Sequence, residues 1–163
     1  MGFNNLGYKK ERLPIDGWLI IDKPKGVTST SVTNRVKNSL NASKVGHGGT
    51  LDPMATGVLP LAFGEATKTL TYVVDGLKEY RFTIRWGESR TTDDAEGAVI
   101  GTSKQRPNKK EILSKLAGFI GEIEQVPPVY SAVKIGGRRA YELARKNQSF
   151  ALKPRLIKIY QFE

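Results

Sequence analysis

The feature that most constrains this chain is a glycine-rich run that leads into an apolar strand. Residues 46–59 read Gly-His-Gly-Gly-Thr-Leu-Asp-Pro-Met-Ala-Thr-Gly-Val-Leu. Glycines allow backbone angles closed to other residues and let another molecule approach the main chain, while Pro53 biases Asp52 toward an extended conformation. The run therefore predicts a loop that presents the Asp52 carboxylate in a fixed direction. Because Asp and Gly are also ordinary turn formers, the pattern alone equally allows Asp52 to be a simple turn residue.

Length and composition indicate a chain that can fold without disulfide cross-links. The 163 residues suit one domain, and the absence of cysteine excludes disulfides and fits a reducing compartment. The N-terminus lacks the apolar core of a signal peptide, and no apolar run approaches the roughly 18 residues that span a bilayer. We expect a cytoplasmic, monomeric protein with no membrane partner.

The charge of the chain is strongly basic and concentrated. The formal net charge is +10, from 26 basic and 16 acidic residues, and residues 134–158 hold eight basic residues against Glu142 alone. A solvated surface on a basic protein is the simpler explanation of such a cluster. Basic side chains also displace condensed counterions from phosphates, so nucleic acid is the partner that this segment favours.

Several familiar chemistries are excluded by what the sequence lacks. One histidine and no cysteine cannot supply a usual three-ligand zinc site. The acidic stretch 93–96 has no supporting ligand at suitable spacing and is interpreted as a loop. No phosphate-loop motif, no Gly-x-Gly-x-x-Gly after the first strand and no Gly-x-Ser-x-Gly elbow is present. We therefore expect neither a metal nor a nucleotide cofactor.

Local patterns predict a series of short elements. Residues 1–15 are interpreted as a flexible basic tail, with order beginning near Asp16. We expect strands over 18–22, 58–63, 78–86 and 156–162, and helices over about 28–39, 64–75, 108–120 and 138–146. Thr28, Ser29 or Thr30 can cap the first helix, and Asn108 followed by Glu111 resembles a capping box. Pro60 favours an edge or a bulge for its strand. The alternation over 78–86 predicts one covered and one wet face, and Gly136-Gly137 predicts a turn.

Further motifs extend a resemblance along most of the chain. Residues 17–29 (Gly-Trp-Leu-Ile-Ile-Asp-Lys-Pro-Lys-Gly-Val-Thr-Ser), 64–68 (Gly-Glu-Ala-Thr-Lys), 78–80 (Lys-Glu-Tyr) and the block 127–145 join the loop at 46–59. Together they resemble, in order, the TruB-like tRNA pseudouridine-55 synthase family. The resemblance implies an α+β fold with a mixed, mainly antiparallel sheet flanked by helices. Residues 16–163 would be part of the catalytic domain, incomplete at the C-terminus because the family's Gly-Thr-Tyr-Ile-Arg segment is absent.

What the resemblance implies for function is the isomerisation of uridine 55 in the T-arm loop of tRNA, without a cofactor. Asp52 would start the reaction, either by attacking the sugar or base or by removing a sugar proton. Tyr80 would stack on the flipped base, and His47 would support the space that the base leaves. Candidate phosphate contacts are Lys23, Lys68, Lys134, Arg138 and Arg139.

Alternatives remain for these residues and for the whole chain. Tyr80 can serve in packing, His47 as a loop donor, and Lys23 and Lys68 as structural residues. The chain as a whole can be a noncatalytic tRNA-binding or tRNA-folding module, an inactive truncated fragment, or a generic basic nucleic-acid binder.

Overall fold

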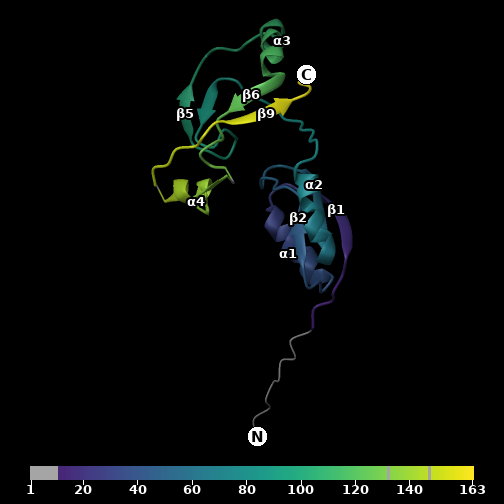
Figure 1. The fold of residues 1–163 in the computed structure, drawn as a ribbon. Helices are drawn as coiled ribbons and strands as arrows, with labels where there is room; N and C mark the ends of the chain where they lie inside the picture. Colours follow the sequence, from purple (N-terminus) through teal and green to yellow (C-terminus); the bar gives the residue numbers. More distant parts are fainter. Residues whose placement is uncertain (1–10, 132, 147) are drawn as a thin grey trace. The chain divides into compact units, whose positions relative to one another are not determined.

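The computed structural model describes residues 11–131, 133–146 and 148–163, and the chain divides into two compact units between Tyr80 and Arg81 (Figure 1). Each unit is described by itself. The elements of the first unit are β1 (Gly17–Lys23), α1 (Ser29–Ser39), β2 (Val45–His47), β3 (Gly57–Phe63), the 3₁₀ helix η1 (Gly64–Thr69) and α2 (Leu70–Val74). Its three strands form an antiparallel sheet in the order β1-β3-β2.

Strand β3 is the central strand of this sheet, so the expectation that Pro60 favours an edge or a bulge was wrong. The register pairs Ile20 with Pro60 on the β1 side, and the Gly48 amide donates to the Pro60 carbonyl at 2.9 Å on the β2 side. The carbonyl and nitrogen of one strand residue face the same neighbour. Proline cannot return the second bond to Gly48, and β2 ends at His47, one residue earlier. The ladder therefore stops where the proline would interrupt it.

The core of the first unit lies around β3. Ala42, Leu59, Leu61 and Phe63 are buried together, and the partly buried side chains packed against them are Ile15, Ile21, Val32, Val36, Val45 and Leu51. Helix α1 begins as predicted, with the Thr28 hydroxyl accepting from the Ser31 amide at 3.0 Å. The helix contributes Val32 and Val36 to the core, whereas Leu40 is exposed.

The predicted tail meets the structure only in part. Residues 1–10 lie outside the described part of the chain. Residues 11–15 run beside the end of α1: the Leu13 amide donates to the Asn41 carbonyl at 2.7 Å, and an Arg12 nitrogen donates to Asn38 Oδ1 at 2.9 Å. Ile15 packs against the core. Ordered contacts therefore begin before Asp16.

The second unit is built from short strand pairs. Its elements are β4 (Glu88–Arg90), β5 (Val99–Thr102), α3 (Lys109–Leu116), the 3₁₀ helix η2 (Ala117–Phe119), β6 (Gly121–Gln125), β7 (Lys134–Ile135), β8 (Arg138–Arg139), α4 (Ala140–Arg145) and β9 (Arg155–Ile159). The pairs are β4 with β5, β6 with β9 and β7 with β8, all antiparallel (Figure 1).

Two local predictions in this unit are confirmed and one is wrong. Helix α3 starts with a complete capping box, in which Asn108 and Glu111 bond each other's amides at 3.0 and 2.7 Å. Gly136 and Gly137 form the β7–β8 turn with φ of 55° and 84°, which suits a two-residue hairpin. The predicted helix 138–146 begins later, because Arg138 and Arg139 pair with β7 and only Ala140–Arg145 is helical.

The predicted strand over residues 78–86 is absent from the structure. Residues 77–85 have no assigned strand, and the side chains of Tyr80 and Phe82 are 69% and 60% exposed. A strand exists through its ladder with a neighbour, and no described residue supplies that ladder here. Phe82 instead packs against Phe162, which also contacts Phe119 edge to face, each at 5.9 Å between ring centroids.

The fold class is the expected one. Helices accompany antiparallel strand pairs in both units, although the strands form four small sheets rather than one larger sheet. No helix in the described residues has both the length and the apolar character needed to cross a bilayer.

Candidate functional site

Asp52 lies on an exposed turn that follows directly on a core residue. Leu51 packs against the buried cluster, and Asp52, the next residue, is exposed. The Ala55 amide donates to the Asp52 carbonyl at 3.0 Å, which closes a turn over residues 52–55. Among the described residues, no side chain or amide donates to the Asp52 carboxylate. The carboxylate is therefore exposed to solvent, which fits both alternatives that the sequence left open, a presented carboxylate and a simple turn residue.

The turn between β1 and α1 and the first residue of α1 hold the residues on both sides of Asp52. The buried Ser29 hydroxyl accepts from the Leu51 amide at 2.9 Å and donates to the Leu51 carbonyl at 3.0 Å. On the other side, the Gly26 amide donates to the Pro53 carbonyl at 2.7 Å. The backbone on both sides of Asp52 is thus hydrogen-bonded to residues more than 20 positions earlier in the chain.

Lys23 also holds the backbone beside Asp52 in place. The expectation that it contacts phosphate does not fit the structure. Its side chain is fully buried at the end of β1. The ammonium donates to the carbonyls of Val27 at 2.9 Å, Pro24 at 3.0 Å and Pro53 at 3.4 Å. An ammonium has three donors, and three carbonyls occupy them. Lys23 therefore holds the β1–α1 turn and the residue after Asp52 together.

The glycines before Asp52 are needed for packing within the unit. A Cβ on Gly46 would lie 2.8 Å from Leu70 Cδ1, and one on Gly48 would lie 3.0 Å from Val73 Cγ1. Leu70 and Val73 belong to α2, so β2 and the start of the loop lie closely against that helix. From the sequence, these glycines were expected to let another molecule approach the main chain. In the structure, the chain's own helix α2 packs closely against Gly46 and Gly48.

His47 closes the beginning of the loop. It is the last residue of β2, and its Nδ1 lies 3.0 Å from the Gly49 carbonyl. A carbonyl only accepts, so Nδ1 carries the proton in this contact. The half-buried imidazole thereby ties the strand end to the glycine turn, which is the loop-donor role left open by the sequence.

Tyr80 and Lys68 are exposed. Tyr80 follows α2 in a segment without assigned secondary structure, and no hydrogen bond to its side chain occurs in the described part of the chain. The structure thus does not place Tyr80 against Asp52. Lys68 forms an ion pair with Glu65 on η1, and this carboxylate, through its hydrogen bond and its charge, raises the pKa of Lys68. Lys68 remains available to an anion that competes with Glu65.

The remaining basic candidates lie on one hairpin of the second unit. Lys134 and Arg138 are exposed, and the β7–β8 register places Lys134 opposite Arg139, whose side chain lies outside the described part. We call β7, β8 and their glycine turn the basic hairpin.

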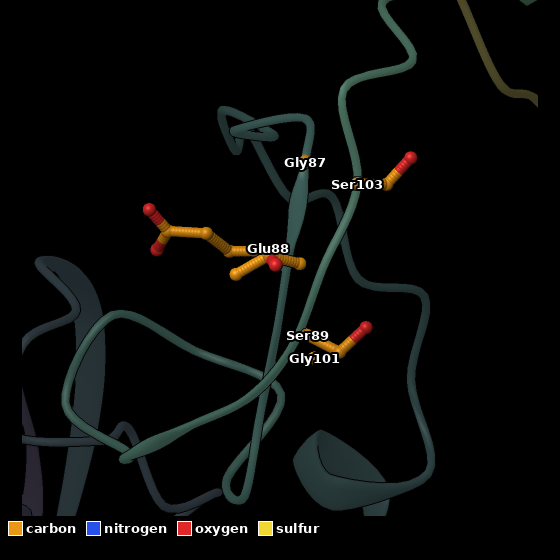
Figure 2. A pocket seen from close by; sticks show the side chains of 6 residues that line it. Gly87, Glu88, Ser89, Gly101 and Ser103 are labelled. Carbon is orange, nitrogen blue, oxygen red and sulfur yellow. The ribbon is translucent and has the colours of Figure 1, made fainter.

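The second unit also contains a pocket formed by the β4–β5 hairpin (Figure 2). Its lining residues are Gly87, Glu88, Ser89, Gly101, Thr102 and Ser103. Hydrogen bonds from Arg90 lower the pKa of Glu88, whose carboxylate projects to one side of the hairpin. None of the residues singled out by the sequence lines this pocket. No group of three His, Asp or Glu side chains suited to a metal ion occurs within the described ranges.

Sequence reasoning missed Ser29, and for Lys23 it listed a phosphate contact with a structural role as the alternative, which is the role that the buried ammonium fits. The signal that they belong to the Asp52 loop is weak in a single sequence, because both bond backbone atoms far along the chain. Pro24 and Gly26 are typical of a turn, but they do not indicate which residues that turn holds.

Comparison with known proteins places this loop in a family. The family model "TruB family pseudouridylate synthase (N terminal domain)" matches residues 37–163. The tRNA pseudouridine synthase B of Rhodospirillum rubrum is 62% identical over 145 residues, which are 89% of this chain and 47% of that protein. The protein of the same name from Gluconacetobacter diazotrophicus is 57% identical over 155 residues, 95% of this chain and 51% of that protein. The chain therefore spans about half the length of these curated relatives.

A solved structure supports the same assignment. A chain in the crystal structure of a Cbf5-Nop10-Gar1 complex matches with a TM-score of 0.55 and 28% identity, covering 89% of this chain and 34% of that chain. The family model covers well over half of the 163 residues, and the relatives are far above 30% identity. This chain belongs to the TruB family of pseudouridylate synthases, in its N-terminal domain.

Proposed function

We propose that this chain carries the catalytic aspartate of a tRNA pseudouridine synthase that acts on uridine 55 of the T-arm. The observation that carries the proposal is Asp52: an exposed carboxylate on a loop seated at both neighbours, within a chain of the TruB family. The names of the relatives support tRNA as the substrate class. Position 55 and the role of Asp52 rest on the motif at residues 46–59.

The reaction is an isomerisation that the chain's own groups can start. The bond from N1 of uracil to C1′ of ribose breaks, the base rotates, and C5 bonds to C1′ while the C5 proton leaves and N1 gains one. Asp52 acts either as the nucleophile at the sugar or base or as the base that removes a sugar proton. Both routes use the carboxylate of Asp52 in its ionised form.

The target nucleotide lies inside a folded loop and has to be extruded first. Extrusion costs a few kcal/mol of stacking and pairing. An exposed tyrosine offers a stacking surface for the extruded base, and this is the role we assign to Tyr80. Phosphate contacts offset the rest, and Lys134, Arg138, Arg139 and Lys68 are the candidates that remain after Lys23 is assigned to the loop.

The test is tritium release from a T-arm stem-loop labelled at C5 of the target uridine. We expect the chain to release tritium and the Asp52→Asn variant, which keeps the shape of the side chain, to release none. Asp75→Asn, an exposed aspartate at the end of α2, serves as a control for the charge change and should behave as the unchanged chain. Equal release by the unchanged chain and Asp52→Asn would refute the proposal.

A second candidate function is tRNA binding without turnover. The exposed Lys134 and Arg138 and the eight-to-one excess of basic residues over 134–158 favour it. It is distinguished by a chain that binds the stem-loop in a salt-dependent manner and releases no tritium.

A further inference from the structure

We propose that Ser29 is a positioning residue for Asp52, acting through the backbone of Leu51. The inference rests on the proposed function in taking Asp52 as the reacting group. It adds the residue that determines the position of this carboxylate. That residue is a serine on α1, and among the described residues its hydroxyl makes no hydrogen bond to the carboxylate itself.

One hydroxyl satisfies both backbone groups of the residue before Asp52. Ser29 Oγ accepts from the Leu51 amide at 2.9 Å and donates to the Leu51 carbonyl at 3.0 Å. The Ser29 side chain is 1% exposed, so water cannot easily replace it. A buried donor or acceptor that loses its partner carries its full desolvation cost, and here a single substitution would leave two such groups.

Ser29 is itself rigidly placed. It is the first residue of α1, directly after the Thr28 cap, and its own carbonyl accepts from the Thr33 hydroxyl at 2.8 Å. Leu51 is also held by its side chain, which packs against the core cluster. The hydroxyl therefore connects two fixed bodies, the start of α1 and the backbone that enters the Asp52 turn.

The other side of Asp52 has independent anchors. The Pro53 carbonyl accepts from the Gly26 amide and the Lys23 ammonium, and the Ala55 amide closes the turn. Without the Ser29 hydroxyl, Asp52 would still be held at Pro53, whereas the backbone of Leu51 would keep only the support of its packed side chain. Because no described group bonds the carboxylate, the backbone of residues 51–53 determines the region that this side chain can reach. A displacement of about 1 Å at a reacting group is enough to cost about a hundredfold in rate.

The experiment combines tritium release under single-turnover conditions with amide hydrogen exchange. The variants are Ser29→Ala, the isosteric pair Ser29→Thr and Ser29→Val, and the control Ser31→Ala, which changes an exposed serine of the same helix. We expect Ser29→Ala to release tritium about ten- to a hundredfold more slowly, with stem-loop affinity within about twofold of the unchanged chain. Ser29→Thr should release tritium faster than Ser29→Val by a similar factor, because threonine carries a hydroxyl where valine carries a methyl group.

Exchange separates positioning from general stability. In Ser29→Ala the amides of Leu51 and Ala55 should exchange faster, while those of the β1–β3 ladder keep their rates. Unchanged rates for Leu51 and Ala55, or equal release by Ser29→Thr and Ser29→Val, would overturn the inference. Uniformly faster exchange throughout the unit would overturn it as well, because it would indicate a purely structural role.

The two proposals fail in different ways. Release that persists in Asp52→Asn contradicts the proposed function and leaves the exchange result to decide whether Ser29 seats the loop. Release that is lost in Asp52→Asn and unchanged in Ser29→Ala contradicts only the role of Ser29.

Discussion

Lys23 carries its ammonium into the interior of the first unit. Lysine is almost never fully buried unless its charge is paired, and here three backbone carbonyls take the place of a carboxylate. Residue type alone favoured a phosphate contact on the surface. The carbonyls that bind the ammonium come from the adjacent turn and from Pro53, 30 residues away, and sequence spacing does not reveal that second contact.

Replacing Lys23 by methionine tests this role at the residue scale. Methionine keeps most of the apolar stem and removes the donors, which leaves the carbonyls of Pro24 and Val27 without this partner. We expect the free energy of unfolding to fall by about 1–3 kcal/mol, measured by urea denaturation. The same substitution at the exposed Lys25, two residues later in the chain, should change the free energy of unfolding by no more than about 0.5 kcal/mol. Equal effects at the two positions would contradict the assigned role.

At the scale of elements, the sequence predicted what local contacts decide. The Thr28 cap of α1, the Asn108–Glu111 capping box and the Gly136-Gly137 turn each involve residues within a few positions, and all are present. The strand over 78–86 needed a partner far along the chain, and its alternating pattern cannot supply one. Arg138 and Arg139 carried helix propensity, but pairing with β7 outweighed it, since propensity is a weak preference that tertiary contacts override.

The capping box makes a prediction for helix α3. Asn108→Ala removes the side-chain acceptor for the Glu111 amide and the partner of the reciprocal bond. We expect about 1 kcal/mol less stability in the second unit, read from thermal unfolding followed by circular dichroism. Ser114→Ala, an exposed change within the same helix, should be neutral or slightly stabilising because alanine is the better helix former. A destabilised Ser114→Ala with an unaffected Asn108→Ala would refute the assignment.

The β4–β5 hairpin should weaken in acid. Hydrogen bonds from Arg90 hold the pKa of Glu88 below its ordinary value of 4.5. Burial raises the pKa of Asp94, but bonds from the Thr92 hydroxyl and the amides of Glu96 and Gly97 outweigh it and lower that pKa below 3.8. The unfolded hairpin then binds more protons. Its stability is therefore present above pH 4.5 and lost as the pH falls through the lowered values.

This acid sensitivity is measurable as amide protection in the hairpin between pH 6 and pH 3. Glu88→Gln should flatten the dependence on pH and lower protection at neutral pH. Glu96→Gln, an exposed change in the same turn, should leave the dependence in place because both bonded carboxylates remain. A hairpin whose protection is the same at both ends of this range would contradict the argument.

On the scale of the whole molecule, the sequence indicated the candidate regions better than the contacts that their residues make. The loop with Asp52 and the basic segment 134–158 were both found, because glycine punctuation and charge density are visible without a fold. The contacts that hold the loop were not predicted. They are hydrogen bonds between backbone atoms of Leu51 and Pro53 and the side chains of Ser29 and Lys23. The excess of positive charge favours a polyanion as the partner, but it does not indicate which basic side chains would contact it.

Salt dependence can identify those cations. Replacing Lys134 and Arg138 by glutamine removes two charges from the basic hairpin, and replacing Lys109 and Lys110 removes the same number from exposed positions on α3. If the hairpin contacts phosphates directly, its double variant should reduce the slope of log affinity against log salt by about two, because each lost phosphate contact lowers the slope by about one. The α3 variant should change the slope far less. Titration of the T-arm stem-loop at several salt concentrations gives both slopes, and equal reductions would mean that net charge, rather than the hairpin, governs binding.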